Sequence, residues 1–400
     1  AEVLKIVRKR MRKKEIMITF DSQATSGAGL NDFLTELSER RVTAITTSTG
    51  PAAPDHERDN NGRPRPQPER YLDSAELLQL CARYWDGPQL GSQINPFKYT
   101  PADTYLQYCK MILLLNQGAD FLLAQAGWDM AKFHELQWYL QWREREAPVI
   151  ARLILLRRGT VSRIMQQELP GLCLSREHGA QVQRAADDGA EGVKQQIRRL
   201  ALQIAGCRLM GYSGVQLGMI PDKETAAAVL DAAFETMGEC PDYRSWVQVW
   251  QQFTDGANAT PLPAGYYAFE NLLDADHLDY DEAGTPALTP AVDPPGTAAR
   301  WRFAAARKLG LARRRGALSG LGRRLLCKAP YDLDCDLGRT MMLSPLQCPK
   351  GLRHGPCGQS QIDGNCELGE FPCFYQHVFR LAHWQHAFKR FETMDDDRRG

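Results

Sequence analysis

Long apolar runs are absent from this sequence. No stretch of about 18 consecutive apolar residues occurs, so we expect no membrane-spanning helix. An excess of one charge sign is absent too: the formal net charge is +1, so no overall field attracts nucleic acid or a membrane surface. The first residues are basic without an apolar stretch behind them, unlike a secretory signal. These absences favour a cytoplasmic protein that binds no nucleic acid.

Basic residues do gather locally, in three runs at residues 8–14, 313–315 and 323–324. No aromatic residues alternate with them, as they do in many nucleic-acid sites. We therefore interpret each run as the solvated face of a helix.

Cysteine pairs at the spacing Cys-x-x-Cys are also absent, which removes the usual signature of zinc ribbons and ferredoxins. Five of the eleven cysteines stand alone along the chain, as buried thiols do in a reducing compartment. The other six lie within residues 327–373. Four of these are separated by eight, eight and six residues: Cys348, Cys357, Cys366 and Cys373.

Glycine and proline interrupt the stretch that holds these four cysteines, so neither a helix nor a strand is expected there. The stretch has too few apolar side chains to fold around a core of its own, whereas four thiolates converging on a metal would hold it. The residue types therefore predict one metal centre at the four cysteines. Free or disulfide-bonded cysteines are the alternative.

Six segments rich in β-branched and aliphatic residues alternate with amphipathic helices over residues 1–253. The predicted strands are residues 15–20, 42–47, 90–95, 121–125, 149–155 and 214–217. One long helix is predicted over residues 176–206. This alternation is typical of a (β/α)8 barrel of the TIM type, whose active site gathers at the carboxyl ends of the strands. A proline-rich linker, residues 254–298, then precedes a helical and cysteine-rich metal-binding domain, residues 299–400.

The cysteine stretch carries a resemblance to a known family. It contains Cys348-Pro-Lys, Gly-Pro-Cys357-Gly, Gly-Asn-Cys366-Glu and Pro-Cys373-Phe-Tyr. These motifs resemble the cysteine-rich C-terminal domain of methylenetetrahydrofolate reductases, which in acetogens also forms an iron–sulfur subunit beside the reductase. The resemblance implies a [4Fe–4S] cluster at the four cysteines and an electron-donor or partner subunit. Zinc is the alternative, because only two upstream cysteines remain of a further cluster found in many relatives.

A second resemblance covers roughly residues 15–235, where landmarks follow the order seen in the methylenetetrahydrofolate reductase barrel. They include Phe20-Asp21, Gly91-Ser-Gln-Ile-Asn95-Pro, Asp120-Phe-Leu-Leu-Ala-Gln125, Trp128-Asp129 and Gly211-Tyr-Ser-Gly-Val-Gln-Leu217. In that family the segment after the second strand supplies two more strands, which have no counterpart here. The resemblance therefore implies a (β/α)8 barrel that is either complete or short by two strands.

The resemblance implies that hydride from a reduced flavin, FAD or FMN, converts the methylene bridge of a tetrahydrofolate derivative to a methyl group. Asp21 takes the position of a family glutamate that protonates the leaving nitrogen, and burial at a barrel mouth raises the pKa of such a carboxyl group. Gln125 and Asp129 are expected to bind folate, the amide of Gln125 offering the pterin edge a donor and an acceptor. The expected flavin contacts are Thr47, Asn95 and Trp128.

The sequence thus predicts an oxidoreductase of folate one-carbon metabolism that interconverts 5,10-methylene- and 5-methyl-tetrahydrofolate and carries an electron-relay domain. Two alternatives stay open. One is a flavin-free, tetrahydrofolate-dependent methyltransferase or demethylase component, which the missing strands and the aspartate at position 21 favour. The other is a non-catalytic electron-transfer subunit of a larger complex.

Overall fold

All six predicted strands form in the computed structural model, which describes residues 14–22, 29–254, 265–281, 292–312, 316–329 and 337–394. They are β1 (Met17–Asp21), β2 (Ala44–Ser48), β3 (Gln89–Ile94), β4 (Phe121–Ala124), β5 (Val149–Ile154) and β6 (Gly214–Gly218). The interleaved apolar and basic residues at 2–14 also predict an amphipathic helix, of which residues 2–13 lie outside the described residues.

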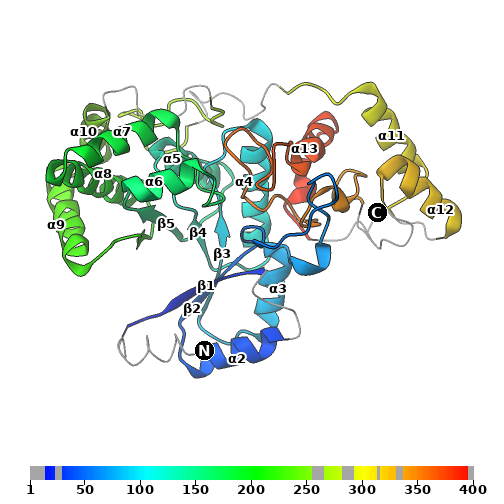
Figure 1. Cartoon of the computed structure of the whole chain (residues 1–400), viewed down its shortest axis with the longest axis horizontal. Helices are drawn as coiled ribbons and strands as arrows, with labels where there is room; N and C mark the ends of the chain where they lie inside the picture. Colours follow the sequence, from blue (N-terminus) through cyan, green and yellow to red (C-terminus); the bar gives the residue numbers. More distant parts are fainter. Residues whose placement is uncertain are drawn as a thin grey trace.

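The six strands form one parallel sheet in the order β1-β2-β3-β4-β5-β6, so each strand pairs with its neighbour in the sequence. Helical crossovers join them, as the connection of parallel neighbours requires. The sheet curls, and helices cover its convex side (Figure 1). Within the described residues, β1 and β6 are its two edges. The architecture is a parallel half-barrel, consistent with the expected TIM-type barrel that lacks two strands.

The helices over the first strands begin where the sequence supplies caps. The side chain of Asp73 caps α3 (Ser74–Tyr84) in a capping box with Glu76. The hydroxyl of Thr100 caps α4 (Pro101–Asn116), whose first residue is a proline. α2 (Leu30–Glu39) and α5 (Met130–Trp142) complete this layer.

The single long helix predicted over residues 176–206 is wrong. After α6 (Arg158–Met165), two helices stand there, α7 (Arg176–Asp187) and α8 (Ala190–Leu209). Gly189 separates them with a φ of +60°, a left-handed conformation that interrupts a helix and that glycine adopts readily. α9 (Lys223–Glu239) and α10 (Tyr243–Phe253) follow β6 and pack on α8.

The main core lies between the convex side of the sheet and the helices. Its largest fully buried side chains include Tyr108, Tyr139, Trp138, Trp246 and Trp250. Residues 265–281, which fall within the predicted linker, pack against α5. There the Trp138 indole donates a hydrogen bond to the carbonyl of Leu278 at 2.7 Å, and Phe269 joins the core. This part of the linker therefore packs as part of the half-barrel.

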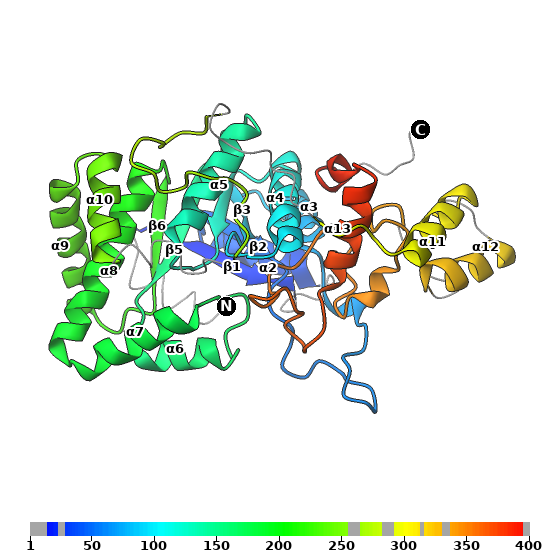
Figure 2. The same ribbon diagram turned by 90° about the horizontal axis from the view of Figure 1, so that it is seen from above.

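The C-terminal part contains α11 (Thr297–Lys308), α12 (Ala317–Gly322) with the π-helical turn η4 (Arg323–Cys327), and α13 (Phe374–Trp384). α13 packs on α4, which brings the irregular cysteine stretch before it against the half-barrel. α11 and α12 form one end of the molecule, and α8, α9 and α10 form the other (Figure 2). No helix in the described ranges is both long and apolar enough to cross a membrane.

Candidate active site and cysteine centre

The concave side of the half-barrel, which we call the inner face, is polar toward the carboxyl ends of the strands. Successive strand residues point to opposite sides of a sheet, so every second side chain faces this side. Its polar positions are Asp21, Ser48, Gln93, Gln125, Arg152 and Gln216. Closed barrels fill their interior mainly with Val, Ile and Leu. Polar side chains at the strand ends therefore indicate a ligand site rather than a packed core.

Asp21 ends β1 and is half-buried on the inner face. The hydroxyl of Ser48, on the neighbouring strand, hydrogen bonds to its carboxylate. Gly50 lies against it with a φ of +72°, and a Cβ at position 50 would come within 2.6 Å of the Asp21 Cγ. Burial raises the pKa of Asp21, while the Ser48 hydrogen bond and the charges of Lys350 and Arg152 lower it. The balance is a raised pKa, so this carboxyl group keeps its proton at a higher pH than an exposed aspartate does.

Arg152 joins the inner-face side chains into one network. Its guanidinium donates hydrogen bonds to Oε1 of Gln216 at 2.7 Å and to Oε1 of Gln125 at 3.1 Å. Oε1 of Gln125 also accepts the N–H of Ala126 at 3.0 Å. Because a guanidinium only donates, both glutamine oxygens face it and both amide NH2 groups are left for a ligand. Oε1 of Gln125 therefore already has two protein donors, and the folate assignment of Gln125 stays a prediction.

Sequence reasoning did not single out Arg152. The signal was a charged residue inside the apolar strand at residues 149–154, in phase with Ile150 on the inner face. A charge at such a position needs a partner, and Asp21 is close enough for the two charges to interact. Burial lowers the pKa of Arg152, and the charge of Asp21 raises it.

Two of the expected flavin contacts are buried, and the strand register places one of them, Thr47, away from the inner face. Thr47 is fully buried and pairs in register with Phe20 and Ser92, on the helix-covered side of β2. Its hydroxyl donates to Oγ of Ser92 at 3.1 Å. The Asn95 amide, 4% exposed, donates to the carbonyls of Gly171 at 2.8 Å and Gly358 at 2.6 Å. Both side chains therefore already have protein partners, and their flavin assignment stays a prediction.

Trp128 and Asp129 are also buried, at 3% and 2% exposed. Trp128 packs among aliphatic residues beneath α6, and its indole N–H has no hydrogen-bond partner within the part of the chain that the structure describes. Asp129 caps α5 through the N–H of Ala131, and it accepts hydrogen bonds from the hydroxyls of Tyr99 at 3.1 Å and Tyr267 at 2.7 Å. Burial raises the pKa of Asp129 to about 6. Its oxygens are occupied by protein donors, and its folate assignment stays a prediction.

Buried polar side chains of the half-barrel hold the backbone of the cysteine stretch. Lys98 donates to the carbonyl of Ser360 at 2.7 Å. Gln107 and Lys110 of α4 both donate to the carbonyl of Pro356, at 3.2 and 3.1 Å. These donors satisfy carbonyl groups that an irregular segment cannot pair within itself. The cysteine stretch is therefore fixed to the half-barrel near the carboxyl ends of β3 and β4.

The four cysteines share one neighbourhood, since the charges of Cys348, Cys357 and Cys366 all act on Cys373. Three of their sulfurs accept backbone N–H groups from the residue two positions further on. The Sγ of Cys357 accepts from Gln359 at 3.4 Å, and Cys348 and Cys366 accept in the same way. Burial raises the pKa of Cys348 to about 11. Among the described residues, no three His, Cys, Asp or Glu side chains are gathered into a metal-ligand set.

A buried ion pair links the cysteine stretch to the strand ends. The ammonium group of Lys350 pairs with Glu367, and the two side chains are 3% and 4% exposed. Lys350 also donates to the carbonyl of Gly50 at 2.7 Å, and Glu367 accepts the N–H of Ala52 at 2.8 Å. Because Gly50 lies against Asp21, the pair connects the cysteine neighbourhood with the candidate acid.

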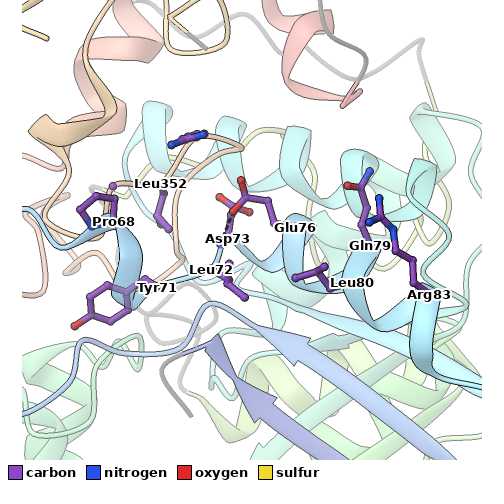
Figure 3. A pocket seen from close by; sticks show the side chains of 11 residues that line it. Pro68, Tyr71, Leu72, Asp73, Glu76, Gln79, Leu80, Arg83 and Leu352 are labelled. Atoms are coloured by element: carbon purple, nitrogen blue, oxygen red, sulfur yellow. Dashed lines mark hydrogen bonds between the residues drawn. The ribbon is translucent and has the colours of Figure 1, made fainter. Parts of the chain in front are cut away.

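A cavity of about 360 Å³ lies between α3 and residues 351–353 of the cysteine stretch (Figure 3). Its charged and polar lining consists of Asp73, Glu76, Gln79, Arg83 and Arg353. On its wall, Asp73 pairs with the buried Lys110 at 3.1 Å. None of the lining residues belongs to the inner face, and charges of both signs share this wall. The candidate active site is therefore the inner face and not this cavity.

Comparison with known proteins adds the family of the C-terminal part. Residues 326–398 match the protein family described as "Methylene-tetrahydrofolate reductase C terminal". The chain thus resembles methylenetetrahydrofolate reductases in this part. The resemblance seen in the cysteine motifs is confirmed, and the half-barrel is consistent with a reductase-like barrel fused to that domain. No curated protein matches the chain.

Among solved structures, one match is described as an uncharacterized protein from Clostridium thermocellum that binds two copies of 5-methyl-5,6,7,8-tetrahydrofolic acid. It has a TM-score of 0.32 and 10% sequence identity, and it covers 58% of this chain and 98% of that chain. A TM-score this low is too weak to establish a common fold. The family match includes all four cysteines of the stretch but none of the inner-face residues.

Proposed function

We propose that this chain is an enzyme of folate one-carbon metabolism that interconverts 5,10-methylene- and 5-methyl-tetrahydrofolate, with the inner face as its substrate site. The C-terminal family match supports a role in folate metabolism. One observation carries the site: a carboxyl group with a raised pKa, Asp21, shares the strand ends with Arg152 and the two glutamine amides that it orients.

The inner face supplies what the chemistry of a reduced folate requires. The amide groups of Gln125 and Gln216 donate to acceptor atoms on the pterin edge. Opening the methylene bridge needs a proton on the leaving nitrogen, which the protonated form of Asp21 supplies. The hydride must come from a separate reductant, for which a bound flavin is the proposed source. The expected flavin contacts Thr47, Asn95 and Trp128 are at most 4% exposed, and we assign them no step.

The burial of these three residues favours a second candidate function. A flavin-free component that transfers a methyl group to or from tetrahydrofolate would use the same pterin contacts and the same acid. It would need no hydride donor beside the inner face. Visible absorbance of the purified protein separates the two candidates. The oxidoreductase should show the absorption bands of bound flavin, whereas the flavin-free component should show no such bands.

Substitution of Gln125 by alanine is expected to weaken the binding of 5-methyl-tetrahydrofolate by about 1–3 kcal/mol, because a buried pterin edge loses its donor. Titration calorimetry measures this change. Arg152→Met should weaken binding as well, since both amide oxygens lose the group that orients them. The exposed Gln166, at the end of α6, gives a matched control in Gln166→Ala. Absence of folate binding by the unmodified protein would refute the proposed site.

We further propose that Cys348, Cys357, Cys366 and Cys373 hold one metal centre, [4Fe–4S] rather than zinc. The chemistry of the donors fits a metal: four soft sulfurs share one neighbourhood, two of them buried and two half-buried, and three accept backbone N–H groups that stabilise thiolates. An iron–sulfur cluster would relay electrons there, whereas zinc would stabilise the fold.

Metal and sulfide analysis after anaerobic purification tests this centre. About four irons with matching sulfide are expected, and one zinc would mark a structural site instead. Cys373→Ser should remove most of the metal, while the control Cys173→Ser, outside the stretch, should retain it. The proposal fails if the protein carries neither metal and all four cysteines react freely with an alkylating reagent in the folded state.

A further inference from the structure

α11 and α12 form one end of the molecule (Figure 2), and large apolar side chains of α11, α12 and η4 are exposed there. Leu318, Leu321 and Leu325 are 87%, 45% and 66% exposed, and Trp301 on α11 is 67% exposed. Leucines exposed to this degree on one short helix are unusual for a surface that faces only water. We call the exposed side of α12 and η4 the leucine stripe.

The spacing of the residues shows that the leucine stripe is one helical face. Leu318, Leu321 and Leu325 follow one another at three and four residues, so they lie one above the other. The opposite face carries Gly320, Arg323 and Cys327 at the same spacing, and all three are buried. The helix therefore packs on the protein through its small and polar side and presents its leucines outward, the reverse of an ordinary surface helix.

The charged residues on α11, α12 and η4 themselves are all basic. Residues 297–312 and 316–329 contain seven basic residues and no acidic residue. Arg324 lies within the stripe and Lys328 follows it, both exposed, while Arg307 and Lys308 are exposed on the adjacent α11. The sequence pattern had suggested a solvated basic helix face. The structure shows that leucines share that face with the cations.

Exposed leucines together with exposed cations favour a binding partner that is both apolar and negatively charged. A second copy of the chain would bring the four exposed cations of this face against the same four, which disfavours self-association through it. Protein interfaces carry about one hydrogen bond per 100–200 Å², and the exposed positions of residues 317–328 offer two cationic donors and no side-chain acceptor. A bilayer with anionic headgroups offers negative charge above an apolar layer at every point of its surface.

We propose that α11, α12 and η4 dock this protein on an anionic lipid bilayer, with the leucine stripe inserted at headgroup level and the flanking cations paired with lipid phosphates. The position of this end, away from β1 to β6 along the long axis, leaves the inner face free (Figure 1). Binding of this kind places the protein on the membrane without a membrane-spanning helix, and it depends on lipid charge and on salt.

Cosedimentation of the intact protein with vesicles tests the docking surface. Vesicles of equal parts phosphatidylglycerol and phosphatidylcholine should bind the protein at low salt, and pure phosphatidylcholine vesicles should not. Leu318→Gln/Leu325→Gln should lower the partition coefficient at least tenfold, and Arg324→Gln/Lys328→Gln about 30-fold. The matched control is Phe234→Gln on α9, which is 70% exposed at the other end of the molecule and should bind as the unmodified protein does.

Three outcomes would overturn the proposal: no binding to the anionic vesicles, equal binding to both kinds of vesicle, or unchanged binding by the double leucine variant. A dimer in analytical ultracentrifugation that Leu318→Gln/Leu325→Gln abolishes would also overturn it, because the face would then join two copies. The substituted side chains are exposed, so thermal unfolding of the variants should match that of the unmodified protein and show that loss of binding is not loss of fold.

Discussion

Replacement of Asp21 by asparagine is expected to lower turnover about 10²- to 10⁴-fold, the usual contribution of a positioned general acid, with folate affinity little changed. Asparagine keeps the size of the side chain but has no proton to give at neutral pH. Conversion of 5-methyl- to 5,10-methylene-tetrahydrofolate with an artificial electron acceptor, followed by chromatography, measures turnover. Calorimetry on the same preparation measures affinity. Unchanged turnover would remove the acid role from Asp21 and leave the binding site standing.

The pH dependence of turnover gives an independent test of the same assignment. Only the protonated carboxyl group donates, so turnover in the reductive direction should fall as the pH rises through the raised pKa of Asp21. The hydrogen bond from Ser48 lowers that pKa. Ser48→Ala should therefore move the fall in turnover to a higher pH. A shift to lower pH, or no shift, would mean that another group controls the rate.

Replacement of Lys350 by methionine is expected to lower the free energy of unfolding by about 3–5 kcal/mol, because it leaves the carboxylate of Glu367 buried without its partner. The two side chains are 3% and 4% exposed, so water cannot replace the lost ammonium group. The carbonyl of Gly50 also loses its hydrogen bond. Urea denaturation followed by tryptophan fluorescence measures the change.

Two further variants identify the cause of that loss. Lys350→Met/Glu367→Gln removes both charges and should recover most of the stability, since burial of an unpaired charge is what destabilises the single variant. Lys223→Met, at an exposed position in the first turn of α9, should have little effect. If the double variant is no more stable than Lys350→Met, the loss of stability comes from packing or from the Gly50 hydrogen bond and not from the unpaired charge.

The strands were predictable because their signal is local. Runs such as residues 149–154 combine β-branched and aliphatic residues at the length of a strand, and a parallel sheet buries both of its sides. The break within the predicted helix at residues 176–206 was missed, because a glycine inside a helical pattern does not reveal its φ. At Gly189 the value is +60°, which the tertiary packing of α7 and α8 decides.

The candidate site was predictable only in part. Asp21 and Gln125 stand at the ends of predicted strands, where parallel α/β proteins place their sites. Thr47 looked equivalent, but strand side chains alternate between two sides, and the register places Thr47 toward the helices. Arg152 was not foreseen, because its partners Gln125 and Gln216 are 27 and 64 residues away along the chain.

The sequence by itself determined the six strands of the parallel half-barrel and the family of the cysteine stretch, because periodicity and motif spacing are properties of neighbouring residues. Tertiary structure alone decided that Arg152 binds the amide oxygens of Gln125 and Gln216. It also decided that the Lys350–Glu367 pair connects the cysteines with Asp21, and that leucines face outward on α12. Each of these depends on contacts between residues far apart in the sequence. A sequence pattern does not show which distant side chains come into contact.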